Sequence, residues 1–128
     1  MVASMGEWHP LHGASRAALA REPRGLIAHA AFETVSAGSR MPEPYRVPPG
    51  TILASLERDY PSAWLSLDAN QQRRALGAAV ARGLHGGALY DALIAATAAE
   101  HDVTLLSADR RAGVAYEAMG ARVEFLQA

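Results

Sequence analysis

The sequence contains no cysteine and no lysine. Without cysteine the chain can form neither a disulfide nor a thiolate metal site, and a reducing cytoplasm is the expected location. Its apolar runs are much shorter than the roughly 20 residues that cross a membrane, and its N-terminus lacks the basic region followed by an apolar one that marks a signal peptide. These absences favour a cytoplasmic protein that is not attached to a membrane.

Neither sign of charge dominates, since 12 arginines stand against 13 acidic residues for a formal net charge of −1. This balance argues against a uniformly basic nucleic-acid-binding surface but permits a local patch. Arginine would serve such a patch well, because its planar group makes forked contacts with phosphate. With 128 residues, the whole chain (1–128) is expected to be one domain that buries about two-thirds of its unfolded surface.

Apolar periodicity and its boundaries predict alternating helices and strands. Helices are predicted at 8–21, 31–41, 51–59, 68–82, 89–101 and 110–119, and short buried strands at 26–28, 63–67, 103–107 and 122–126. Ser66 or Asp68 is a candidate cap for the helix that ends near Arg82. The prolines between Pro42 and Pro49 predict an extended connector. This alternation indicates an α/β fold, a three-layer α/β/α sandwich with a short, largely parallel sheet.

Two aspartates, Asp91 and Asp109, are predicted at one edge of that sheet. Asp91 lies in the first turn of the helix at 89–101, and Asp109 follows the strand at 103–107. Ten helical residues rise about 15 Å, and five or six strand residues return about 17 to 20 Å in the opposite sense. Both carboxylates therefore reach the carboxyl edge of the sheet, where open α/β sheets bind ligands.

Glu33 is expected to be a third acid at the same edge. It starts the helix that follows the strand near Ile27, and right-handed connections bring that helix start to the carboxyl edge. Carboxylates crowded together stay ionised only when a cation compensates them, and oxygen ligands suit Mg²⁺ or Mn²⁺. Such a metal can activate a water toward a phosphodiester and stabilise charge on the departing oxygen.

The segment YDALIAATA, which contains Asp91, and the segment LLSAD, which ends at Asp109, resemble the PIN-domain family. More narrowly, they resemble the VapC-type toxins of type II toxin–antitoxin pairs. Glu33 in HAAFETVSAGSRM matches the second acid of the family, and the proline-rich PEPYRVPPG is also similar. The resemblance extends over nearly the whole chain, and its specificity is concentrated between Gly87 and Asp109.

The resemblance implies a metal-dependent endoribonuclease that hydrolyses RNA phosphodiester bonds, is held inactive by a small antitoxin and forms a homodimer. Asp91 would bind the Mg²⁺ or Mn²⁺ directly or through water, Glu33 and Asp109 would complete the acidic pocket, and Ser107 would donate or accept a hydrogen bond within it. Arg110 and Arg111 directly follow Asp109 and are candidates for binding RNA phosphates.

One family feature has no counterpart in this sequence. The family begins with an apolar strand that ends in an aspartate, whereas MVASMGEWHPLH is similar to the helix that follows it. Glu7, in a helical context, is a poor substitute for that aspartate. Loss of a central strand would leave buried backbone groups without hydrogen-bond partners, and each such group lowers stability by about 1 to 3 kcal/mol. The total stability of a domain is only about 5 to 15 kcal/mol. We therefore interpret the sequence as truncated at a misassigned start, which the intact mass of the endogenous protein would test.

Each candidate residue also has an ordinary structural interpretation. Asp91 would interact favourably with a helix dipole, and Asp109 would cap the helix that follows it. Glu33 would be a common first-turn acid. Ser107 would bind local backbone groups, and the two arginines would be solvated charges.

Two other functions remain open at this stage. The first is a non-catalytic, degenerate PIN module that retains only dimerisation and antitoxin binding. The second is a different magnesium-using α/β enzyme of the phosphatase type, which would require an early aspartate nucleophile that the sequence does not supply.

Overall fold

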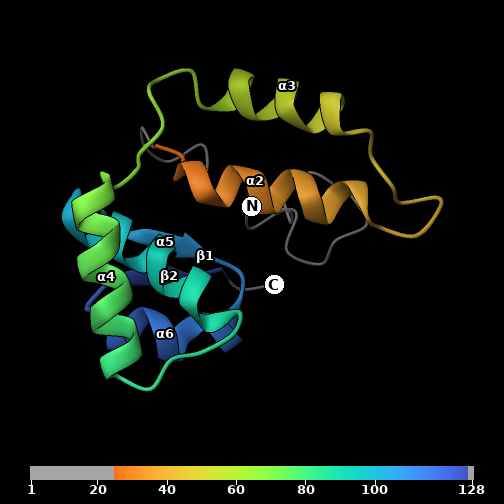
Figure 1. Cartoon of the computed structure of the whole chain (residues 1–128). Coiled ribbons are helices and arrows are strands. Elements are labelled where there is room, and N and C mark those ends of the chain that lie inside the picture. Colours follow the sequence, from red (N-terminus) through yellow and green to blue (C-terminus); the bar gives the residue numbers. More distant parts are fainter. Residues whose placement is uncertain (1–24, 127–128) are drawn as a thin grey trace. The chain divides into compact units, whose positions relative to one another are not determined.

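The computed structural model describes residues 25–126 (Figure 1). The predicted helix at 8–21 and Glu7 lie outside these residues. The chain divides into two compact units. Of the described residues, unit 1 comprises 25–64 and Leu126, and unit 2 comprises 65–125. Each unit is described by itself.

Unit 1 contains two helices, α2 (Ala28–Ser39) and α3 (Pro49–Asp59), which pack against each other. Pro49 occupies the first turn of α3, where its missing N–H costs nothing. Within the proline-rich connector, the N–H of Val47 donates to the carbonyl of Gly38 over 3.1 Å. The buried cluster of this unit is Leu26, Ala31, Ile52, Leu56 and Tyr60.

The start of α2 differs from the prediction. Residues 26–28 do not form a strand; Ile27 makes a single β-bridge, and the helix begins at Ala28 rather than at Ala31. Glu33 therefore lies in the second turn and not in the first. A three-residue apolar run does not distinguish a strand from a buried helix start, and the alanines that follow Ile27 favour the helix.

Unit 2 alternates helices and strands. Its elements are α4 (Ala69–Ala81), α5 (Ala88–Glu100), β1 (Leu105–Ser107), the 3₁₀ turn η1 (Arg110–Ala112), α6 (Gly113–Ala118) and β2 (Val123–Phe125). Both α4 and α6 pack on α5, and β1 pairs with β2 in parallel, with Ser107 opposite Phe125. This arrangement confirms an α/β fold with a short parallel sheet.

The predicted strand at 63–67 was wrong beyond a single β-bridge at Leu65. Side chains occupy the backbone acceptors of this segment. Gln72 Nε2 donates to the carbonyl of Leu67 over 2.9 Å, and His101 Nε2 lies 3.0 Å from the carbonyl of Ser66. These contacts replace the ladder that a strand would need.

Asp68 is the cap of α4. Its Oδ1 accepts a hydrogen bond from the Gln71 N–H over 2.7 Å, and the Gln71 side chain accepts one from the Asp68 N–H over 2.9 Å. This reciprocal capping box satisfies two backbone donors at the helix start. After α4, Gly83 and Gly86 adopt φ values of 79° and 59°, which glycine tolerates without strain.

Small side chains line the buried face of α5. Ala92, Ala95 and Ala98 are all 1% exposed or less. Because alanine projects little from the backbone, it allows neighbouring elements to approach the helix closely. None of the described helices has the length and apolar character needed to cross a membrane.

Candidate functional site

Asp91 lies in the first turn of α5 and is half-buried. The helix is preceded by Gly87, which has no side chain to cap it. A carboxylate in this turn interacts favourably with the exposed N–H groups and the positive end of the helix dipole. The structure therefore confirms where the sequence analysis placed Asp91, and a negative charge is stabilised at this position.

Asp109 follows β1 by two residues and caps η1. Its backbone is extended, and its Oδ1 accepts a hydrogen bond from the Arg111 N–H over 3.0 Å. The Arg111 Nε lies 3.8 Å from the same oxygen. Both of these contacts with described residues use Oδ1. The capping role is thus present and uses Oδ1, and the side chain of Asp109 is 52% exposed.

Ser107 holds the backbone of Asp109. It ends β1, is 8% exposed, and its Oγ accepts a hydrogen bond from the Asp109 N–H over 3.0 Å. The same Oγ lies 3.3 Å from the hydroxyl of Tyr116 on α6. Ser107 therefore links the strand end to Asp109 and α6, which is the local backbone role weighed from the sequence.

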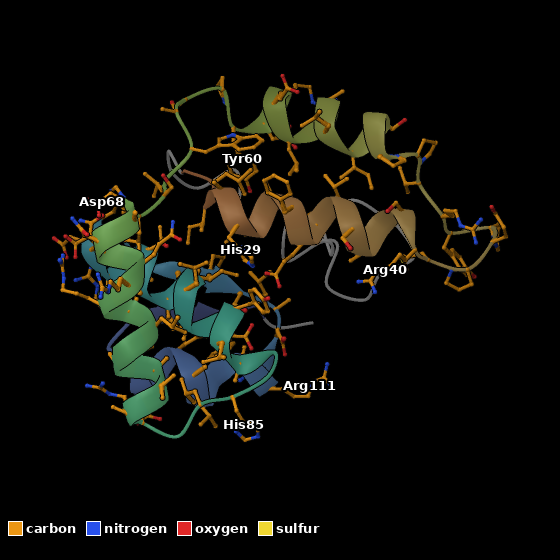
Figure 2. All side chains as sticks on the ribbon, in the orientation of Figure 1. His29, Arg40, Tyr60, Asp68, His85 and Arg111 are labelled. Atoms are coloured by element: carbon orange, nitrogen blue, oxygen red, sulfur yellow. The ribbon has the colours of Figure 1, made fainter. Side chains whose placement is uncertain are left out.

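The start of α5 and the end of β1 lie at the same end of unit 2. Figure 1 shows that α5 and β1 run in opposite directions. Only residues 101–104 separate them in the chain. In Figure 2, His85, just before α5, and Arg111, just after β1, lie toward one end of this unit. The first turn of α5 and the segment after β1, which carry the two aspartates, thus share this end.

Glu33 lies on α2 and is exposed. It belongs to unit 1, whereas Asp91 and Asp109 belong to unit 2. Within residues 25–126, no three histidine, aspartate or glutamate side chains form a group that could hold a metal ion. The gathering of all three acids at one edge therefore stays a prediction.

The two candidate arginines differ in their surroundings. The guanidinium carbon of Arg110 lies 5.1 Å from the centroid of the Phe125 ring. The side chain of Arg111 is 97% exposed, and its long ion pair with Asp109 is its only contact of that kind among the described residues. Of the two, Arg110 is the one whose guanidinium group lies over an aromatic ring.

Sequence reasoning missed Tyr116 and Phe125. Tyr116 contacts Ser107, and the ring of Phe125 packs against Tyr116 with centroids 6.4 Å apart. Strand register was the signal that could have indicated the neighbourhood of Phe125, though not the residue itself. If the two predicted strands paired in parallel from their first residues, Ser107 would lie opposite Leu126, whereas the structure pairs it with Phe125.

Comparisons with known proteins show the family of this chain. The family model of the PIN domain matches residues 1–117. The chain is 39% identical to Ribonuclease VapC40 of Mycobacterium tuberculosis over 98% of its own length and 93% of that protein. It is 34% identical to Ribonuclease VapC27 of the same organism, over 90% and 83% of the two chains. No solved structure matches it. The chain therefore belongs to the PIN-domain family, within its VapC-type members.

Proposed function

We propose that this protein is a metal-dependent endoribonuclease that hydrolyses RNA phosphodiester bonds in the cytoplasm. It acts as the toxin of a type II toxin–antitoxin pair, is held inactive by a small antitoxin protein and forms a homodimer. The similarity to two proteins named ribonucleases supports the reaction class. The observation that carries the proposal is the shared position of Asp91 and Asp109 at one end of unit 2.

The chemistry of the available ligands suits a hard divalent cation. Asp91 and Asp109 offer carboxylate oxygens, and the chain has no cysteine that would favour a softer metal. In this proposal Asp91, Asp109 and Glu33 hold Mg²⁺ or Mn²⁺. When bound, the metal would lower the pKa of a water and stabilise charge on the departing oxygen.

The chain's own side chains hold the site in place. Asp109 is held at two points: its carboxylate Oδ1 accepts from the Arg111 N–H, and its backbone N–H donates to Ser107 Oγ. The first turn of α5 stabilises the charge of Asp91. Arg110 and Arg111, next to Asp109, are placed to bind the phosphates of RNA and keep the strand at the acids.

Cleavage of an RNA panel in Mg²⁺ or Mn²⁺ by the full natural protein, freed of any bound partner, tests the proposal. Asp91→Asn preserves the shape of the side chain but removes its charge, so kcat should fall on the order of 100-fold or more. Asp102→Asn is the matched control. Asp102 follows the other end of α5, where it forms an ion pair with Arg122, and cleavage should stay within about twofold of the wild-type rate.

Glu33→Gln tests whether the acid of unit 1 belongs to the same site. We expect kcat to fall by about 10-fold or more, while Glu57→Gln, an exposed glutamate on α3 of the same unit, leaves it unchanged. Wild-type cleavage by Asp91→Asn would remove that residue from the mechanism. No cleavage by the wild-type protein in either metal would favour the non-catalytic binding module instead.

A further inference from the structure

The aromatic side chain of Phe125 lies beside the proposed site but is not one of its proposed metal-binding residues. Phe125 ends β2 and pairs in register with Ser107 at the end of β1. Because the strands are parallel, both residues lie at the carboxyl edge of the sheet. Asp109 follows Ser107 by two residues. The ring is therefore at the edge where the chain turns into η1.

Two neighbours fix the ring of Phe125. Tyr116 of α6 stacks with it, with centroids 6.4 Å apart and ring planes at 28°. Gly113, the first residue of α6, allows the other approach, because a Cβ at this position would lie only 3.3 Å from Phe125 Cζ. A side chain at Gly113 would therefore require the ring to shift by a few tenths of an ångström.

Arg110 rests on the ring that these contacts hold. Its guanidinium carbon lies 5.1 Å from the ring centroid, within the range of cation–π attraction. Stacking on an aromatic face restrains the plane of the guanidinium group but leaves its N–H edges able to bind a phosphate. A side chain restrained in this way loses less conformational freedom when a ligand binds.

Arg111 lacks these properties. Its side chain is 97% exposed, and its Nε lies 3.8 Å from Asp109 Oδ1, too far for a good hydrogen bond. It must therefore be ordered on binding, and it already interacts with a carboxylate. Of the two adjacent arginines, Arg110 is the one whose position the fold determines.

We propose that Arg110 is the principal phosphate-binding arginine of this site and that Phe125 is its positioning residue. This inference rests on the proposed function, because the ligand it names is the RNA backbone. Phe125 does not touch the substrate; it acts by holding the guanidinium group of Arg110 at the edge that carries Asp109.

Binding of a fluorescently labelled single-stranded RNA of mixed sequence, measured in EDTA so that cleavage plays no part, tests the proposal. Arg110→Ala should raise Kd about fivefold or more and lower the slope of log K against log salt by about 0.7, the value for one lost phosphate contact on a single strand. Arg111→Ala should raise Kd by a smaller factor than Arg110→Ala, because its side chain is not held in place. Arg74→Ala, at an exposed arginine of α4, is the matched control and should leave Kd unchanged.

Pentafluorophenylalanine at position 125 separates positioning from packing. It keeps the shape of the ring but reverses its electrostatics, so a cation–π contact weakens while packing is retained. We expect this variant to reproduce most of the loss of RNA binding seen in Arg110→Ala, with Tm unchanged. Phe125→Leu should do the same with some loss of Tm, and adding it to Arg110→Ala should weaken binding no further.

In the cleavage assay, the same Phe125 variants should raise KM and leave kcat within about twofold, because they remove binding shared by substrate and transition state. Equal losses of RNA binding in Arg110→Ala and Arg111→Ala, or wild-type binding by the fluorinated variant, would overturn the inference. So would the absence of RNA binding by the wild-type protein. Binding that depends on Arg110, without cleavage in Mg²⁺ or Mn²⁺, would instead contradict the nuclease activity alone.

Discussion

Units 1 and 2 build their cores from different kinds of side chain. The buried cluster of unit 1 centres on Ile52, which is 1% exposed, with Leu56 and Tyr60 around it. In unit 2 the most buried positions of α5 are alanines and a threonine, and Ala95 and Ala98 are fully buried. One unit therefore depends on filling a space with a large side chain, and the other on keeping a space small.

This difference bears on where the candidate site lies. The small face of α5 allows α4 and α6 to pack against it. Asp91 therefore lies on a well-packed helix, and Asp109 caps η1, which leads into the α6 helix packed on α5. Sites built on rigid elements hold their side chains more accurately than sites on free loops. The comparison predicts that the two units respond to mutation in opposite ways, unit 1 to loss of volume and unit 2 to its gain.

The largest effect is expected from truncation in unit 1. Ile52→Ala should lower the free energy of unfolding by about 2 to 5 kcal/mol, through lost burial and the cavity left behind. Urea unfolding followed by circular dichroism measures the change. Leu53→Ala, next to it on α3 but 42% exposed, is the control and should cost less than about 1 kcal/mol. Similar costs for the two variants would contradict a core centred on Ile52.

The reverse change should disrupt unit 2. Ala98→Leu inserts a large side chain at a fully buried position of α5 and should cost about 1 to 3 kcal/mol by overpacking. Ala99→Leu places the same side chain on the exposed face of that helix and should be nearly neutral. Urea unfolding of the two proteins gives the comparison, and a neutral Ala98→Leu would show that the α5 interface has spare volume.

One glycine in each unit allows a comparison in which replacement by alanine should change stability in opposite directions. A Cβ at Gly38 on α2 would collide with Ile52 Cδ1, whereas a Cβ at Gly77 on α4 would meet nothing within 4 Å. Alanine gains up to about 1 kcal/mol over glycine in a helix. Gly77→Ala should therefore stabilise the protein by about that amount, while Gly38→Ala destabilises it by about 1 kcal/mol, because overpacking outweighs the gain.

The collision at Gly38 can be tested directly. Ile52→Val removes the Cδ1 atom that a Cβ at Gly38 would strike, so Gly38→Ala should become neutral or stabilising in that background. Thermal unfolding of the four proteins in this double-mutant cycle measures the coupling. An unchanged cost of Gly38→Ala in the valine background would assign the effect to another contact.

Much of unit 2 could be predicted from the sequence, because local signals agreed there. Asp68, one of the two predicted candidates, caps α4, and the apolar run before Ser107 is long enough to indicate β1. The prediction was less accurate where the contact of a single side chain determines the local backbone structure. The 3₁₀ turn at Arg110–Ala112 arises because Asp109 accepts from the Arg111 N–H, and periodicity alone does not reveal such a contact.

The positions of Asp91 and Asp109 at one end of unit 2 also followed from the sequence, since helix rise and strand rise are fixed lengths. The contacts that support these two aspartates could not be predicted from the sequence. Tyr116 reaches Ser107 only through the packing of α6 on the sheet end, and Arg110 reaches Phe125 only through strand register. Such contacts join residues far apart in the chain, and no local pattern of residues encodes them.

The smallest expected effect concerns the polar residue within the small-residue core. Thr97 is 1% exposed, and its hydroxyl donates to the carbonyl of Leu93 over 2.7 Å. That carbonyl stays within the helical ladder when the hydroxyl is removed, so Thr97→Val, which keeps the shape, leaves no unpaired donor and should change stability by less than about 0.5 to 1 kcal/mol. Thr97→Ser keeps the hydroxyl but removes a buried methyl group, and should cost about 1 kcal/mol or more. Urea unfolding should rank serine as the more harmful change. The opposite order would mean that hydrogen bonding, rather than the shape of the buried side chain, determines which residue this face of α5 accepts.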